Sequence, residues 1–318
     1  MSIESLTQEI IHDNLSGSQD LTTKAGRLVL RLLQEKKHSP SEELHRDVLE
    51  IGSKLLRAQP AMASLFNLFN TILSDLNKAP DGSAAAKDLQ RATETYIREM
   101  KEHNRSISAH LFRRVRTKDT ILIYSSSRSV TEALFHCWKK GKRFSVICSE
   151  SRPAGEGTLL ARRLATHGIP TSLTTDALAM SLMTAPPGSK RRMSLALVGA
   201  DSVSLRGLTN KSGTLCLAIV AKHCSVPFYA LAGSEKFLPL NYPIDKAIQD
   251  KPPEEILAHP PRGLKIINRY FDITPLSYLT AVITEKGPLT PLEIKKHLKK
   301  LKLHPRLTAA LKRVNSQR

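Results

Sequence analysis

The chain has 318 residues, of which 41% are hydrophobic and 24% charged, and its formal net charge is +19 at pH 7. This composition supports a packed core in one large or two medium-sized domains. No apolar run approaches the roughly 20 residues of a membrane-spanning helix, and residues 1–16 are too polar for a secretory signal peptide. We therefore expect a cytoplasmic protein without a membrane partner.

The cysteines stand in apolar surroundings and show no CxxC spacing. They are Cys137, Cys148, Cys216 and Cys224. Cysteines in such surroundings are typical of core packing in a reducing compartment. We expect no disulfide, no metal site and no cofactor.

Residues 1–112 show the periodicity of amphipathic helices. Apolar side chains recur at helical spacing in residues 22–36 and again in residues 41–58, which open on a Ser-Glu-Glu start signal. Pro60 stands at the first turn of a further helix, and residues 84–115 form a long amphipathic one. We therefore expect a helical N-terminal domain over residues 1–112.

From Asp119 onward, short apolar runs alternate with helical segments. Strands are predicted at residues 120–124, 143–148, 171–173, 193–198 and 227–232, with helices at 130–140, 158–167, 177–183 and from 213. This alternation predicts a mainly parallel sheet with right-handed crossovers. We expect an α/β fold in which residues 113–318 form a Rossmann-like C-terminal domain.

Much of the positive charge lies in a basic C-terminal tail at residues 295–318. The tail can form a basic helix with a narrow Leu and Ile stripe, which favours a solvated helix docked by that stripe. The alternative is an RNA or ribosome partner, because a charge of +19 attracts polyanions. Aromatic residues make up 5% of the chain and no RNA-recognition motif is present, so RNA binding is the weaker interpretation.

Polar side chains follow three of the predicted strands. They comprise Ser125, Ser127 and Arg128 after the first strand, Arg152 after the second, and Asp201, Asn210 and Lys211 after the central one. Because the carboxyl ends of parallel strands meet at one edge of a sheet, these side chains can converge there. Serines, arginines, a lysine and a carboxylate together suit a phosphorylated polyol. Each cluster alone is an ordinary turn or helix cap, so the functional interpretation depends on their convergence.

Two glycines accompany the aspartate and lysine positions. Gly199 and Gly213 would let the backbone come close to a ligand. A cluster of free backbone N–H groups beside Lys211 suits a phosphate.

Several short motifs stand in a fixed order between about residues 105 and 290. They are Ser149-Glu150-Ser151-Arg152-Pro153, Gly199-Ala200-Asp201, Asn210-Lys211-Ser212-Gly213-Thr214, Val226-Pro227-Phe228-Tyr229, Glu235-Lys236-Phe237, and Phe271-Asp272-Ile273-Thr274-Pro275 with Thr284-Glu285-Lys286-Gly287. In these motifs the chain resembles the family that unites the alpha, beta and delta subunits of translation initiation factor 2B with methylthioribose-1-phosphate isomerase and ribose-1,5-bisphosphate isomerase. It is most similar to prokaryotic initiation-factor-2B-like proteins.

The resemblance implies a helical domain, a Rossmann-like domain, and a cleft between them that holds a sugar phosphate. It also implies a homodimer or higher oligomer built through the C-terminal domain. Carried over by position, the resemblance implies that Arg152 and Lys211 bind phosphate and that Asn210 and Asp201 bind sugar hydroxyls. It implies that Ser125, Ser127 and Arg128 line the pocket. Ser16-Gly17-Ser18 stands where the isomerases use an Arg-Gly-Ala turn. Lys236 is either a ligand or an ordinary surface lysine.

Two positions of the resemblance carry the isomerase chemistry. Asp201 stands at the position of the family aspartate, whereas the position of the family cysteine falls at Ser125. Taking a proton from one atom and delivering one to another needs two groups, and a serine hydroxyl is weak without a base. The sequence therefore favours a non-catalytic regulatory or assembly protein, similar to the alpha subunit, that binds a phosphorylated sugar or a nucleotide-derived metabolite. A sugar-phosphate aldose–ketose isomerase is the alternative, and a protein with a translation-factor or RNA partner is a further one.

Overall fold

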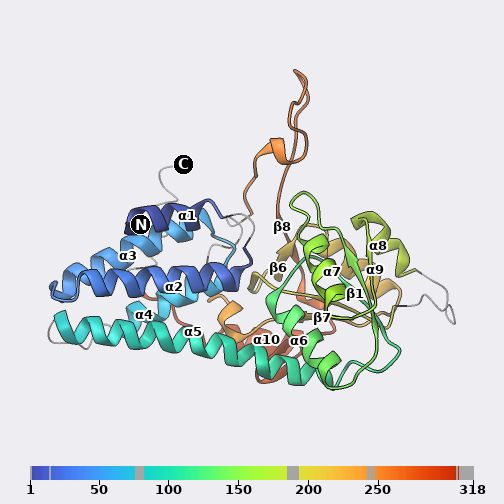
Figure 1. Cartoon of the computed structure of the whole chain (residues 1–318), viewed down its shortest axis with the longest axis horizontal. Coiled ribbons are helices and arrows are strands. Elements are labelled where there is room, and N and C mark those ends of the chain that lie inside the picture. Colours follow the sequence, from blue (N-terminus) through green and yellow to red (C-terminus); the bar gives the residue numbers. More distant parts are fainter. Residues whose placement is uncertain are drawn as a thin grey trace.

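The computed structural model describes residues 2–13, 16–75, 82–184, 193–240, 242, 244, 248–305 and 307. A helical N-terminal region lies beside an α/β region (Figure 1). The predicted fold class is therefore confirmed, with helices first and a mainly parallel sheet after them.

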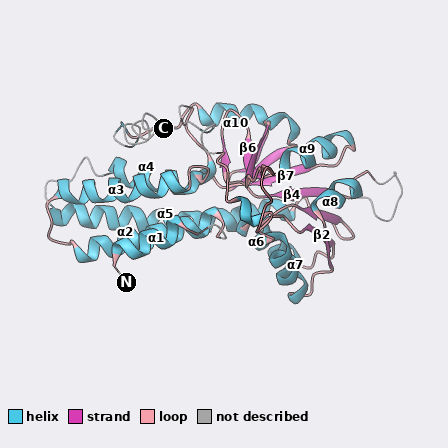
Figure 2. Cartoon of the chain, turned by 90° about the horizontal axis from the view of Figure 1, so that it is seen from above, coloured by secondary structure: helices cyan, strands magenta, loops and turns pink. Residues whose placement is uncertain are grey.

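The helices of the N-terminal region run side by side along the length of the molecule (Figure 2). They are α1 (Ile3–Ile11), α2 (Ser18–Glu35), α3 (Ser41–Ala58), α4 (Ala63–Asp75) and α5 (Gly82–Phe112). α2 and α5 approach so closely that a Cβ added at Gly26 would lie 2.5 Å from Ile97 Cδ1. Phe66 and Phe69 of α4 are fully buried among these helices, so their apolar faces form the core that the periodicity predicts.

The α/β region is built on a seven-stranded sheet. Its strands are β1 (Thr120–Ile123), β2 (Ser145–Ser149), β3 (Thr171–Thr174), β4 (Leu195–Val198), β7 (Phe228–Leu231), β9 (Ala281–Thr284) and β10 (Gly287–Leu289). The order is β10-β9-β7-β4-β1-β2-β3, and only the β9–β10 pair is antiparallel. β4 is buried along its whole length between β1 and β7, as expected for a central parallel strand.

Helices cover both faces of this sheet (Figure 2). They are α6 (Arg128–Lys139), α7 (Glu156–Thr166), α8 (Asp176–Leu182), α9 (Thr214–His223) and α10 (Pro291–Leu298). α6 and α7 pack on one face with the end of α5, while α9 and α10 pack on the other. The carboxyl ends of β1, β2 and β4 consequently meet at one edge, beside the first turns of α2 and α4.

A second, three-stranded sheet was not predicted from the sequence. Its antiparallel order is β5 (Ser202–Val203), β6 (Leu208–Lys211) and β8 (Phe271–Thr274). Asn210 pairs with Asp272 across β6 and β8, so the Asn-Lys motif lies on a strand. The periodicity of the sequence gives no sign of this sheet, because its strands are very short and β8 is about sixty residues from β6.

The cysteine prediction is wrong in part. Cys137 and Cys148 are buried in the core, but Cys216 is exposed on α9 and Cys224 is only half-buried. In the basic tail, α10 is docked by the buried side chains of Ile294 and Leu298, in agreement with the predicted stripe. Arg306 and residues 308–318 of the tail lie outside the described residues.

The segment before β8 forms an arm that extends away from the body of the molecule (Figure 1). The arm contains the short 3₁₀ helix η4 (Pro253–Glu255). Exposed apolar side chains lie on it at Ile256, Leu257, Leu264 and Ile267. Across all the helices described, none combines the length and the apolar character needed to cross a membrane.

Gly213 makes room for a side chain of the fold. Its φ is 103°, and an added Cβ would lie 2.1 Å from Tyr124 Oη. The Tyr124 hydroxyl donates a hydrogen bond to the Ser212 carbonyl at 2.8 Å. The expectation that this glycine admits a ligand is therefore corrected, because the close neighbour is Tyr124.

Replacing Gly213 by alanine is expected to destabilise the fold more than the same change at Gly141. Gly141 is the matched control, because its φ is 90° and nothing lies within 4 Å of an added Cβ. Both variants should lose about 1–2 kcal/mol to left-handed backbone strain, and Gly213→Ala a further ~1–3 kcal/mol to overpacking. Urea unfolding measures the difference, and equal losses would show that Tyr124 imposes no constraint.

Candidate functional site

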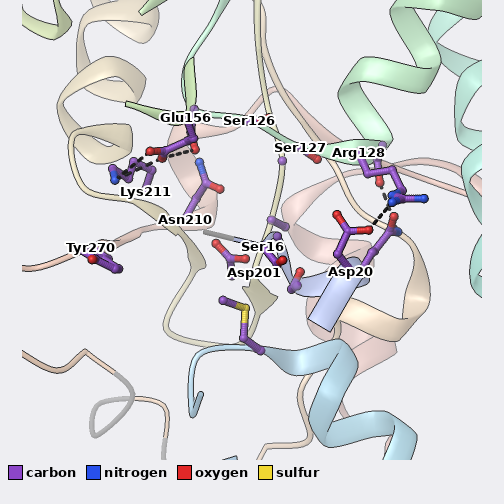
Figure 3. A pocket seen from close by; sticks show the side chains of 18 of the residues that line it. Ser16, Asp20, Ser126, Ser127, Arg128, Glu156, Asp201, Asn210, Lys211 and Tyr270 are labelled. Atoms are coloured by element: carbon purple, nitrogen blue, oxygen red, sulfur yellow. Dashed lines mark hydrogen bonds and ion pairs between the residues drawn. The ribbon is translucent and has the colours of Figure 1, made fainter. Parts of the chain in front are cut away.

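A cavity of about 370 Å³ lies where the helical region meets the carboxyl edge of the large sheet. Residues from both regions line it, and the close-up of Figure 3 shows their side chains turned toward a common space. The lining includes Ser16, Gly17, Ser18, Gln19, Asp20, Ser125, Ser126, Ser127, Arg128, Glu156, Gly199, Asp201, Asn210, Lys211, Lys236 and Tyr270. Three strand ends and the start of α2 thus meet around one cavity.

Every residue proposed from the sequence except Arg152 lines this cavity. Arg152 is exposed on the turn after β2, and its backbone N–H donates to Asp176 Oδ2 at 2.8 Å. The residue from that strand end which does reach the cavity is Glu156, the first residue of α7. The loop after β2 therefore reaches the cavity through Glu156, while the predicted ligand Arg152 lies outside it.

The turn after β1 brings backbone donors to the cavity. Ser125 has a φ of 67°, and its backbone N–H donates to Ser151 Oγ at 3.0 Å. α6 then begins at Arg128, and the Ser127 side chain makes no capping hydrogen bond to the helix. The first N–H groups of a helix attract anions, so this end of α6 is suited to a phosphate.

Glu156 connects the two loops that follow β1 and β2. Its Oε1 accepts a hydrogen bond from Ser125 Oγ at 2.9 Å. Lys211 Nζ lies 3.2 Å from Oε1 and 3.3 Å from Oε2 (Figure 3). Lys211 is 5% exposed, so the lysine end of this ion pair is shielded from solvent, while the Glu156 side chain is 20% exposed.

Lys236 is not a surface lysine. It lies in the 3₁₀ helix η2 (Ser234–Lys236) and is 3% exposed. Its Nζ donates a hydrogen bond to Ser18 Oγ, and burial lowers its pKa while the charges of Asp201 and Glu235 act in the opposite direction. This lysine therefore lines the cavity beside the first residue of α2.

Asp201 is a buried carboxyl group of the cavity whose pKa departs from the ordinary value. Burial raises its pKa to about 6, the charge of Lys236 and a hydrogen bond from Ser18 oppose that rise, and the charge of Glu156 adds to it. Its backbone is fixed on both sides, since its N–H donates to the Thr209 carbonyl and its carbonyl accepts from Ala63. A carboxyl that titrates close to neutral pH is suited to delivering a proton.

Carboxylates accompany three of the cations in the cavity. Arg128 pairs with Asp20 and Lys211 pairs with Glu156 (Figure 3), while Lys236 interacts with the charge of Asp201. A phosphate entering the cavity would compete with Asp20 for Arg128 and with Glu156 for Lys211. These cations were predicted from the sequence, whereas Asp20 and Glu156 were not, because their pairings join residues far apart in the chain.

A buried polar network lies behind the cavity. Glu235 accepts from Gln19 at 3.2 Å and meets His103 Nδ1 at 2.8 Å. Gln19 and Asn104 exchange hydrogen bonds, and Ser129 donates to Asn104. Glu235 belongs to one of the family motifs, but its partners could not be predicted because the members of the network come from α2, α5, α6 and η2. In the described part of the chain, no group of three or more His, Cys, Asp or Glu side chains suits a metal ion.

Comparisons with known proteins agree with this architecture. Residues 14–291 match the family described as "Initiation factor 2 subunit family" (IF-2B), and the chain therefore belongs to that family. The resemblance inferred from the motifs is confirmed.

The relatives carry different names. The ribose 1,5-bisphosphate isomerase of Methanocaldococcus jannaschii is 30% identical over 84% of this chain and 86% of its own length. A putative translation initiation factor eIF-2B subunit 2-like protein of Pyrococcus horikoshii is 32% identical over 90% of this chain and 95% of its own. The crystal structure of the Pyrococcus horikoshii OT3 translation initiation factor eIF-2B superposes with a TM-score of 0.78, at 29% identity, covering 91% of this chain and 97% of that one. Because the relatives carry both isomerase and translation-factor names, family membership does not distinguish a binding protein from an enzyme.

The Asp201 carboxyl should titrate with a midpoint of about pH 6. Carbon-13 NMR of aspartate-labelled protein can follow it, with the signal assigned by Asp201→Asn. Lys236→Met should raise the midpoint further, because a positive charge that favours the carboxylate is removed, whereas Lys222→Met on the exposed side of α9 should leave it unchanged. A wild-type midpoint near the ordinary value of 3.8 would contradict the burial of this group.

Proposed function

We propose that this chain binds a phosphorylated sugar, or a nucleotide-derived metabolite with a sugar phosphate, in the cavity between its helical and α/β regions. The observation that carries the proposal is the meeting of the α6 N-terminus and Arg128 with Asp201, Asn210 and Lys211 around one polar space. The helix end and the guanidinium are suited to phosphate. The amide and carboxyl groups are suited to sugar hydroxyls.

Two roles are compatible with such binding. One is a regulatory or assembly protein, which the absence of a thiol at position 125 favours. The other is an aldose–ketose isomerase, which the raised pKa of Asp201 and the name of the Methanocaldococcus relative favour. Binding is common to both roles and is therefore tested first.

Ribose 1,5-bisphosphate should raise the melting temperature, while ribose at the same concentration should not. Arg128→Ala is expected to weaken binding about 5- to 100-fold, since a charge-assisted hydrogen bond contributes roughly 1–3 kcal/mol. Arg152→Ala should keep the wild-type affinity, because Arg152 lies outside the cavity. Isothermal titration calorimetry measures both variants.

The affinities of these two variants distinguish the two arginines that were predicted from the sequence as site residues. Equal weakening by Arg152→Ala would place the phosphate at the turn after β2 and contradict the cavity as the site. The absence of any stabilisation by a panel of sugar phosphates would contradict the proposal as a whole.

We also propose that the chain forms a homodimer or higher oligomer through its C-terminal region. The arm before β8 supports this, because it projects from the body of the molecule and exposes Leu264 and Ile267. Apolar side chains exposed on a projecting segment are typical of protein contacts.

Sedimentation analysis should give at least twice the 35.2 kDa chain mass. Replacing both Leu264 and Ile267 by aspartate should shift the protein toward monomer, because burial of the new charges at an interface is costly. The matched control replaces the exposed Leu173 and Leu178, which lie away from the arm. A monomeric wild-type protein at micromolar concentration would contradict this assignment.

A further inference from the structure

The serine at position 125 has a carboxylate partner that the sequence did not reveal. Ser125 Oγ donates to Glu156 Oε1 at 2.9 Å, and the same carboxylate accepts from Lys211 Nζ. The Glu156 side chain is 20% exposed and lines the cavity together with Asp201. The cavity therefore contains two carboxyl groups that come from different strand ends and can reach one ligand.

The backbone around Glu156 holds its side chain toward this space. Gly155 precedes α7 with a φ of 73°, a conformation that glycine adopts without strain. A Cβ on Gly157 would lie 1.9 Å from the Ser149 carbonyl oxygen, so the first turn of α7 is packed directly on the end of β2. Glu156 is therefore held in the first turn of α7, next to the end of β2.

The two carboxyl groups have different surroundings. Glu156 accepts hydrogen bonds from a lysine and a hydroxyl and is partly open to the cavity. Asp201 is enclosed by the protein, and the charge of Glu156 itself makes ionisation of Asp201 less favourable. Pairs of titratable groups with opposed environments are typical of an acid and a base that act together.

Isomerisation of a furanose 1-phosphate needs one proton donor and one proton acceptor. Opening the ring breaks the bond between C1 and the ring oxygen, and that oxygen takes a proton. A hydride then moves from C2 to C1, and the C2 hydroxyl loses its proton as the carbonyl forms. One proton is delivered and one is removed, so the reaction needs no oxidant or reductant.

We propose that Glu156 is the general base of this site, accepting the proton of the C2 hydroxyl while Asp201 delivers one to the ring oxygen. The inference depends on sugar-phosphate binding in the cavity and goes beyond it, because it makes the chain an aldose–ketose isomerase that needs no thiol at position 125. Ser125 is a positioning residue that holds the Glu156 carboxylate by its hydrogen bond. Lys211 pairs with that carboxylate in the free site and turns toward the substrate phosphate when it binds.

The test measures conversion of ribose 1,5-bisphosphate and of methylthioribose 1-phosphate to their ketoses by the full-length protein. Glu156→Gln keeps the size of the side chain and an acceptor for Ser125 but removes the base. It should lower kcat about 10²- to 10⁴-fold, with no increase in KM because Lys211 loses its competing carboxylate. Glu102→Gln, at an exposed ion pair on α5, should leave both constants unchanged, and Ser125→Ala should lower kcat by less than Glu156→Gln.

Binding is measured beside turnover in every variant, so that the two proposals can be told apart. Binding without turnover in the wild type, with turnover gained in Ser125→Cys, would overturn the role of Glu156 and leave sugar-phosphate binding intact. A loss of less than tenfold in Glu156→Gln would show that Glu156 only neutralises Lys211, which also overturns it. No binding of either sugar by the wild type would remove the proposed function, and this inference with it.

Discussion

The geometry of the cavity depends on the hydrogen bonds that the buried carboxyl group of Glu235 makes to Gln19 and His103. A buried charge is costly unless it is paired and hydrogen-bonded, and Glu235 obtains its partners from helices of the other region. Gln19 comes from α2 and His103 from α5. Burial by itself lowers the pKa of His103, but the hydrogen bond and charge of Glu235 raise it above the ordinary value. These two contacts tie α2 and α5 to the segment that follows β7.

The contacts of Glu235 determine which groups face the cavity. With α2 fixed by Gln19, its first turn brings Ser18 to Lys236 and Asp20 to Arg128. α4 is fixed in a similar way, because the Ala63 N–H donates to the Asp201 carbonyl. Each side of the cavity thus contributes charges that the other side balances. Asp201 is enclosed by this arrangement, and its burial raises its pKa to about 6 against the opposing charge of Lys236.

The general architecture follows from the sequence, because local patterns determine it. Helical periodicity in residues 1–112 and the strand–helix alternation after Asp119 are enough to place Ser125, Arg128 and Asp201 at one sheet edge. The role of Glu156 could not be predicted in this way, because its partners Ser125 and Lys211 lie 31 and 55 residues away in the chain.

Other features could not be predicted because they depend on contacts between distant segments. The pairing of β6 with β8 joins residues about sixty positions apart, and the network around Glu235 spans more than two hundred. No pattern within a short window shows such contacts. The reverse holds for Arg152. Its position after β2 predicts a phosphate ligand, but it lies outside the cavity and its backbone N–H donates to Asp176.

The turn between β2 and α7 has a consequence for how such a site can change its chemistry. Its shape depends on backbone atoms and on side chains that face away from the cavity: Asp176 receives two N–H groups, Ser151 receives the Ser125 N–H, and Gly157 lies against a carbonyl. The side chains at 125 and 156 add one hydrogen bond between the loops to that framework. A substitution at either position therefore changes the groups that face the cavity while most contacts that shape the turn remain.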